Sequence, residues 1–179
     1  MIVIMGVAGA GKSIQGRWLA DEFGLPWLST GEFLRMMVSG ERRKEMVKGK
    51  LLDDVEIIHM ADKIFHLLDK DEEFILDGFP RTLTQAQWLL AQHKVGLLNI
   101  SHVIHIQASE EVVMDRLLNR GRPDDTEQAI KKRFEEYRST TLPVIEDFEK
   151  QGISVLHVDG DTTPEEVHSL ISPVIKNYV

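Results

Sequence analysis

The start of the chain carries the feature that most constrains its fold. An apolar run, Ile2 to Met5, leads directly into GVAGAGKS at Gly6 to Ser13, which fits the pattern GxxxxGK[ST]. Between a strand and a helix, such glycines let backbone N–H groups and the helix dipole converge on one anion. Lys12 can reach outer phosphates, and the Ser13 hydroxyl can ligate Mg²⁺. The pattern predicts a phosphate-binding loop, and its strand-loop-helix context disfavours the alternative of a glycine-rich turn without chemistry.

Composition limits the remaining possibilities. The 179 residues correspond to one domain, and 42% hydrophobic with 28% charged residues is ordinary for a soluble protein. The absence of cysteine excludes disulfides and thiolate metal sites. A net charge of −8 disfavours a general nucleic-acid surface, and no apolar run approaches the ~20 residues that span a bilayer. The N-terminus lacks the flanks of a signal peptide. We therefore expect a cytoplasmic monomer without nucleic-acid or membrane partners.

Short apolar segments alternate with amphipathic ones along the whole chain, without an internal repeat. This alternation predicts an α/β fold, a five-stranded parallel sheet flanked by helices. The expected strands are Ile2 to Met5, Leu25 to Leu28, Phe74 to Leu76, Val103 to Ile106 and Ile153 to Val158.

Helix starts can be placed between these strands. Asp53 with Glu56 resembles a capping box, and Thr163 followed by Pro164 and two acids opens the last helix. The stretch 41–50 is basic and polar with few large apolar residues, which indicates a more exposed excursion of the chain. We expect a small subdomain there.

A carboxylate follows the third expected strand. Asp77 stands at the carboxyl end of a parallel strand, where ligands of such sheets bind, and it could organise Mg²⁺. Gly78 permits close backbone approach, and Arg81 could grip a phosphate with its planar fork. Two simpler interpretations stay open: the segment after Asp77 could be a turn, and Thr82 with Gln85 could be a capping box.

Arginines gather in the later part of the chain. Arg116 and Arg120 are four residues apart on a helix that Ser109 begins, so they share one face; Arg122 and Arg133 follow. A single arginine usually belongs to a solvated surface. Four of them in an acidic chain with a phosphate loop indicate a different role, because guanidinium groups can neutralise a phosphoryl group during its transfer.

Several motifs, in this order, make the chain resemble the adenylate kinases, within the nucleoside monophosphate kinases, over nearly its whole length. They are Gly6 to Gln15, STGEFLR at Ser29 to Arg35, DGFPRT at Asp77 to Thr82, Arg120 with RPDD at Arg122 to Asp125, RFEEY at Arg133 to Tyr137, Pro143, and VDG at Val158 to Gly160.

The resemblance implies a role for each matching residue. The implied catalytic residues are Lys12, Arg81, Arg120, Arg122 and Arg133. The implied donor (ATP) site is Gly9, Ala10, Gly11, Lys12, Ser13, Ile14, Arg116 and Gly160. The implied acceptor (AMP) site is Thr30, Gly31, Arg35, Leu52, Gly78, Arg81 and Gln85. The implied Mg²⁺ residues are Ser13 and Asp77, directly or through water.

The resemblance implies reversible transfer of a phosphoryl group from MgATP to AMP, giving two ADP. Thr30 and Thr82 favour AMP over pyrimidine monophosphates. Two alternatives remain: a kinase for CMP or UMP, and a non-enzymatic nucleotide switch, although the Asn-Lys-x-Asp motif of guanine switches is absent. The implied organisation is one domain, 1–179, with an acceptor subdomain inserted at 29–58 and a truncated lid at 120–126.

The chain departs from the family pattern at two places. The family usually has glycine and threonine after the loop lysine, whereas this chain has Ser13 and Ile14. Only Gly121 separates Arg120 from Arg122, where long members insert a lid. We therefore expect a minimal lid and different metal geometry.

Overall fold

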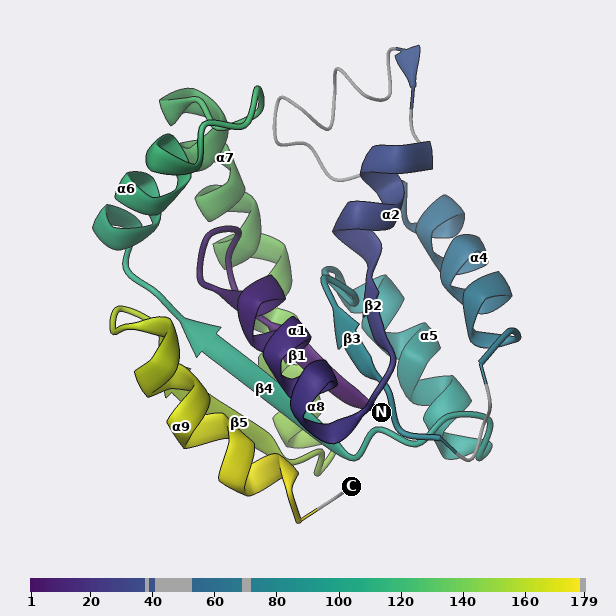
Figure 1. Cartoon of the computed structure of the whole chain (residues 1–179). Coiled ribbons are helices and arrows are strands. Elements are labelled where there is room, and N and C mark those ends of the chain that lie inside the picture. The colour runs from purple at the N-terminus through teal and green to yellow at the C-terminus, as the bar shows by residue number, and fades with distance from the viewer. Residues whose placement is uncertain (38, 41–52, 69–71, 178–179) are drawn as a thin grey trace.

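A computed structural model of the chain describes residues 1–37, 39–40, 53–68 and 72–177 (Figure 1). The predicted excursion at 41–50 and the predicted site residue Leu52 lie outside these ranges.

The centre of the molecule is a five-stranded sheet in which every neighbouring pair is parallel. The strand order is β2-β3-β1-β4-β5. The strands are β1 Ile2–Met5, β2 Trp27–Ser29, β3 Ile75–Asp77, β4 His102–Gln107 and β5 Val155–Asp159. The predicted α/β class and five parallel strands are therefore confirmed.

Three predicted strand starts were too early, and at two of them a hydrogen bond to the end of the preceding helix holds the residue that was predicted to begin the strand. Gly24 ends the first helix in the left-handed conformation (φ 68°), and the Leu25 N–H donates to the Ala20 carbonyl. The Ile153 N–H likewise donates to the Phe148 carbonyl. β3 begins and ends one residue later than predicted and thus includes Asp77, whose register partners are Ile4 and Ser29.

Helices cover both faces of the sheet (Figure 1). The described helices are α1 Lys12–Phe23, α2 Thr30–Met37, α4 Asp54–Phe65, α5 Leu83–Lys94, α6 Glu110–Arg120, α7 Glu127–Glu136, α8 Leu142–Lys150 and α9 Pro164–Ile175. A π-helical segment, η1 Tyr137–Thr141, joins α7 to α8.

Successive side chains of β1 point to opposite faces of the sheet, and a separate core cluster lies on each face. Ile2 and Ile4 pack with buried residues of α1, α6, α7 and α9. Val3 and Met5 pack with buried residues of α4, α5 and α8 on the opposite face. A strand buried on both faces reads as a continuous apolar run, which explains why β1 was recognisable from sequence.

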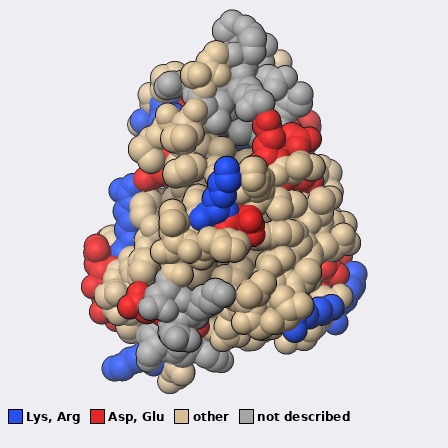
Figure 2. Space-filling model, turned by 90° about the vertical axis from the view of Figure 1, so that its right-hand side faces the viewer, with Lys and Arg blue, Asp and Glu red and all other residues tan. Residues whose placement is uncertain are grey.

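Predicted helix starts are confirmed by their caps. Asp53 accepts hydrogen bonds from the Val55 and Glu56 N–H groups, and Thr163 with Glu166 forms a reciprocal capping box. Within the described ranges, no helix combines the length and apolarity that a membrane crossing needs. On the face shown in Figure 2, acidic and basic side chains lie dispersed among uncharged residues.

Candidate active site

One cavity of about 940 Å³ lies at the carboxyl ends of the strands. Every predicted site residue in the described ranges lines it; Leu52 alone lies outside those ranges. The lining includes residues that the sequence separates by more than 100 positions, such as Lys12 and Arg133. The topology thus brings together the donor, acceptor and arginine groups that the motifs predicted.

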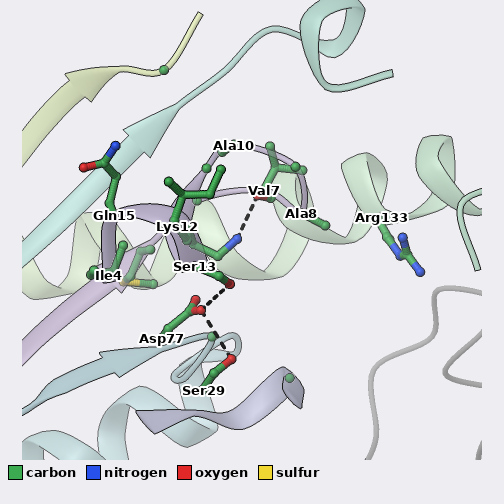
Figure 3. Close-up of a pocket in the computed structure, with 18 of the residues that line it drawn as sticks. Ile4, Val7, Ala8, Ala10, Lys12, Ser13, Gln15, Ser29, Asp77 and Arg133 are labelled. Atoms are coloured by element: carbon green, nitrogen blue, oxygen red, sulfur yellow. Dashed lines mark hydrogen bonds between the residues drawn. The ribbon is translucent and has the colours of Figure 1, made fainter. Parts of the chain in front are cut away.

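The phosphate loop leaves β1 through a glycine that no other residue could replace. Gly6 has φ 145°, and a Cβ there would lie 2.3 Å from the Ile106 carbonyl oxygen of β4. At the end of the loop, the Lys12 ammonium donates to the Val7 carbonyl at 2.8 Å (Figure 3). Burial lowers the pKa of Lys12 to about 8, although the Asp77 carboxylate opposes this shift. A phosphate in the loop would supply the missing anion.

A hydroxyl and carboxylate cluster lies beneath the loop. The Ser13 hydroxyl donates to Asp77 Oδ2 at 2.6 Å, and the Ser29 hydroxyl donates to the same oxygen at 3.3 Å (Figure 3). Ser29 and Asp77 end β2 and β3 and are register partners, and Ser13 reaches them from the first turn of α1. Ser29 begins the STGEFLR motif, but the motif did not predict its contact with Asp77.

The predicted acceptor side is built around Gly78, which follows β3. Its φ is 84°, and a Cβ there would lie 2.9 Å from the Thr30 hydroxyl oxygen. That hydroxyl donates to the Asp77 carbonyl at 3.2 Å. Arg81 Nε donates to the Gly78 carbonyl at 2.8 Å. Burial lowers the pKa of Arg81, and Arg133 adds to this shift, whereas the Asp77 and Glu136 carboxylates oppose it. The guanidinium is thus a buried cation whose charge the nearby carboxylates compensate only in part.

Asp54 was missed by the sequence analysis. Its two carboxylate oxygens accept from Thr82 Oγ1 at 2.9 Å and from Gln85 Nε2 at 2.8 Å. Gln85 Oε1 accepts from the Arg81 N–H, so both ends of its amide have protein partners. Thr82 caps α5, as predicted, and does not line the cavity. Thr82 can therefore affect a bound base only through Asp54 and Gln85.

An arginine and carboxylate network forms the opposite wall. Arg120 donates two hydrogen bonds to Asp125, at 2.8 and 2.7 Å, and Arg133 donates to Asp125 at 3.1 Å. Arg133 also donates to Asp124 at 2.5 Å. Burial alone would raise the pKa of Asp125, but the hydrogen bonds and charges of the two arginines lower it. The acidic pair therefore holds two predicted catalytic arginines beside the cavity.

Two further cations face the same space. Burial lowers the pKa of Arg35, and the charge of the nearby Arg122 lowers it further. Both guanidinium groups line the cavity from segments far apart in sequence. Since like charges repel each other, such an arrangement favours an anionic ligand between them.

The chain is similar in sequence to known proteins over nearly its whole length. A sequence model of the family described as adenylate kinase matches residues 4–153. The adenylate kinase of Corynebacterium urealyticum is 36% identical over 172 residues, 93% of each chain. Adenylate kinase 1 of a Nostoc species has the same identity and coverage, and the adenylate kinase of Prochlorococcus marinus is 35% identical over 182 residues, 97% of each chain. The chain belongs to the adenylate kinase family.

Both departures from the adenylate kinase pattern have structural correlates. Ser13 bonds Asp77 directly, while Ile14 is 45% exposed at the cavity wall. At the second departure, Gly121 caps α6 in the left-handed conformation (φ 67°), and the chain turns at once into Asp124 and Asp125. The turn after α6 is thus held by the arginine network.

The predicted donor end of this adenylate kinase cavity contains a guanidinium held by two backbone carbonyls. Arg116 donates to the Gly160 carbonyl at 2.7 Å and to the Thr162 carbonyl at 2.9 Å. A Cβ on Gly160 would lie 2.7 Å from the Gln107 carbonyl oxygen, so glycine brings β5 close to β4 at this point. Trp18 also lines the cavity, which its position in the sequence did not indicate.

Proposed function

We propose that this adenylate kinase transfers the γ-phosphoryl group of ATP to AMP at the described cavity, by direct in-line attack of the acceptor phosphate. The observation that carries this proposal is the convergence of Lys12, Arg81, Arg120, Arg122 and Arg133 on one cavity. Positioning and charge neutralisation are the main contributions that a protein makes to phosphoryl transfer. No covalent enzyme intermediate is needed.

The residues present fit a magnesium ion. Mg²⁺ is usually held by one or two carboxylates with waters and substrate phosphates, and the Ser13 hydroxyl and Asp77 carboxylate are oxygen donors 2.6 Å apart. We propose that these two side chains hold the ion, and Ser29 orients the carboxylate. When bound, Mg²⁺ neutralises phosphate charge.

The basic side chains of the cavity bind different phosphate groups. Lys12 holds the outer donor phosphates, and Arg35 with Arg81 holds the acceptor phosphate. Arg120, Arg122 and Arg133 neutralise the group in transit, which requires Arg120 and Arg133 to exchange carboxylate bonds for phosphate bonds. The donor base lies against Arg116. We propose residues 29–58 as the acceptor subdomain and 120–126 as a stub lid.

The organisation and surroundings of the enzyme follow from the same proposal. Its partners are ATP, AMP and ADP, and it works as a cytoplasmic monomer. A molar mass near that of one chain, measured by light scattering at assay concentration, supports this organisation.

A coupled assay of ADP formation tests the function. With ATP as donor, kcat/KM for AMP should exceed that for CMP, UMP and GMP by at least ~10²-fold, because Thr30 and Gln85 frame the acceptor base. Comparable phosphorylation of CMP would favour the alternative of a pyrimidine monophosphate kinase. Nucleotide binding without transfer would favour a switch.

Donor choice should be much weaker than acceptor choice. The stub lid leaves the phosphate loop, Arg116 and the backbone at Gly160 as the main donor contacts, and phosphates are common to all nucleoside triphosphates. We expect kcat/KM values for ATP, GTP and CTP to lie close together, with some ATP hydrolysis in the absence of AMP. A preference for ATP over GTP above ~10³-fold would contradict an open donor site.

Arginine removal tests the charge roles. Arg81→Ala and Arg122→Ala should each lower kcat by at least ~10²-fold, because each removes a cation from a phosphoryl centre. Lys131→Ala is the matched control, since it removes an exposed positive charge from α7 without touching the cavity. A folded Arg122→Ala variant with the turnover of the control would remove Arg122 from the mechanism.

A further inference from the structure

A line of four titratable side chains connects the cavity wall to the surface. Tyr137, which lines the cavity at the start of η1, has its hydroxyl 2.5 Å from His105 Nε2. His105 Nδ1 lies 3.0 Å from His157 Nδ1, and His157 Nε2 lies 2.8 Å from Glu149 Oε1. None of these contacts has a role in the mechanism described above. We call these four residues the histidine chain.

His105 is the most buried member of the histidine chain, and the two outer members are exposed. His105 is 1% exposed in the middle of β4, and its register partner on β5 is His157. His157 and Glu149 are exposed to solvent on the outer side. A buried polar side chain needs hydrogen-bond partners, and the parallel pairing of β4 with β5 supplies one of them. The histidine chain therefore forms a continuous hydrogen-bonded path from the cavity to solvent.

The two ends determine the direction of every hydrogen bond. Burial raises the pKa of Tyr137 to about 12, so its hydroxyl is a neutral donor, while Glu149 as a carboxylate can only accept. Tyr137 thus donates to His105 Nε2, His105 Nδ1–H donates to His157 Nδ1, and His157 Nε2–H donates to Glu149. Both imidazoles are then neutral, with different tautomers.

A charge on the buried imidazole is unfavourable. Burial lowers the pKa of His105 to about 4, and His157 and Lys12 lower it further, whereas Glu149 opposes them. The groups that face His105 are therefore Tyr137 from η1, His157 from β5, Glu149 from α8 and Lys12 from α1. His157, by contrast, is exposed to solvent and lies beside the Glu149 carboxylate.

The segment that Tyr137 begins, η1, contacts a proposed catalytic arginine. η1 ends at Thr141, whose hydroxyl donates to the Arg81 carbonyl at 2.9 Å. η1 also continues directly from α7, which carries Arg133. π-helical segments lack the regular hydrogen bonding of an α-helix and recur at functional sites. Fixing Tyr137 to β4 thus fixes the segment that lies between the two arginines.

We propose that His105 and His157 are positioning residues for phosphoryl transfer, which hold Tyr137 and η1 in place, and that uptake of one proton reverses the histidine chain and lowers turnover. The proposal rests on the proposed roles of Arg81 and Arg133. The hydrogen bonds of the histidine chain can be measured without a turnover assay. A failure of this proposal can therefore be distinguished from a failure of the proposed arginine roles.

Uptake of one proton at the cavity end moves the existing protons one place along the histidine chain. Tyr137 passes its proton to His105 Nε2, His105 passes its Nδ1 proton to His157 Nδ1, and Tyr137 takes one proton from solvent in the cavity. The product is an imidazolium at His157 paired with Glu149, and a neutral His105 that now donates to Tyr137. The Tyr137 O–H then points away from β4, so the bond that anchored η1 has changed direction.

Nitrogen NMR of the labelled wild-type protein tests the direction of the bonds. At about pH 8, we expect His105 to carry its proton on Nδ1 and His157 to carry its proton on Nε2. His105→Gln and His157→Gln assign the signals. A His105 proton on Nε2 at this pH overturns the proposal, whatever the enzyme's activity.

The pH dependence of kcat tests the consequence. The amide introduced by His157→Gln can still accept from His105 and donate to Glu149, but it cannot become cationic. Between about pH 8 and about pH 5.5, the ratio of wild-type to variant kcat should fall at least ~5-fold. Substrate phosphates titrate equally in both enzymes and cancel. His59→Gln, which replaces an exposed histidine of α4, should leave its own ratio to wild type constant. A constant ratio for His157→Gln overturns the proposal.

Discussion

Replacing Lys12 by methionine is expected to lower kcat/KM for phosphoryl transfer by about 10³-fold while leaving the free enzyme at least as stable as wild type. The ammonium donates to the loop carbonyl of Val7 and lies where donor phosphates are expected. Methionine has a side chain of similar length but removes the charge and the hydrogen bond to Val7. Loss of activity would therefore report the loss of phosphate neutralisation.

The stability of the same variant should depend on pH in a defined direction. Burial places the folded-state pKa of Lys12 at about 8, below its ordinary value of 10.5, so between these values the unfolded chain binds more protons. Wild-type stability therefore rises with pH in this window relative to Lys12→Met. At pH 7 Lys12 is charged in both the folded and the unfolded wild-type protein. Burial of this charge then lowers the free energy of unfolding by its full amount.

Thermal unfolding checks this sign. Lys12→Met should unfold at a higher temperature than wild type at about pH 7, and the difference should shrink by about pH 9.5. Lys94→Met, which replaces an exposed lysine at the end of α5, is the control and should show no such change. A folded Lys12→Met variant with wild-type kcat/KM would show that the loop lysine does not contact the transferred group.

Local motifs made much of this site predictable. The loop from Gly6 to Ser13 and the position of Asp77 after a strand depend only on residues close in sequence. They can therefore be recognised without knowing how distant segments pack. The same is true of Arg116 and Arg120 on one helix face. Helix caps such as Asp53 and Thr163 were predictable for the same reason, because a cap acts on N–H groups within three residues.

Contacts between segments far apart in the sequence could not be predicted from local motifs. Asp54 bonds Gln85 across 31 residues, and His105 meets His157 across 52, which depends on the register of β4 against β5. Strand starts failed for a related reason. At Leu25, an apolar residue after Gly24 fits both a helix end and a strand start, and only the N–H bond to Ala20 decides between them.

Asp125→Asn is expected to destabilise the enzyme by about 3 kcal/mol. The Asp125 side chain is fully buried and accepts from Arg120 and Arg133, so loss of its charge leaves two guanidinium groups facing each other. Breaking a buried pair by removing one partner typically costs about 3–5 kcal/mol. The lower figure applies because Arg120 is 33% exposed and can recover solvent. Asp124→Asn, with 18% of its side chain exposed and one arginine partner, should cost less.

Urea unfolding at several pH values checks the cause of this loss. The arginines lower the folded-state pKa of Asp125 below 3.8, so its stabilising charge is present above that value and is lost as the pH falls through the folded pKa. The difference between wild type and Asp125→Asn should stay constant from pH 7 to about pH 4 and close below it. MgATP should also stabilise Asp125→Asn more than wild type, because its phosphates need not displace a carboxylate from Arg120 and Arg133. Equal stabilisation of the two proteins would mean that the acidic pair does not compete with the nucleotide for these arginines.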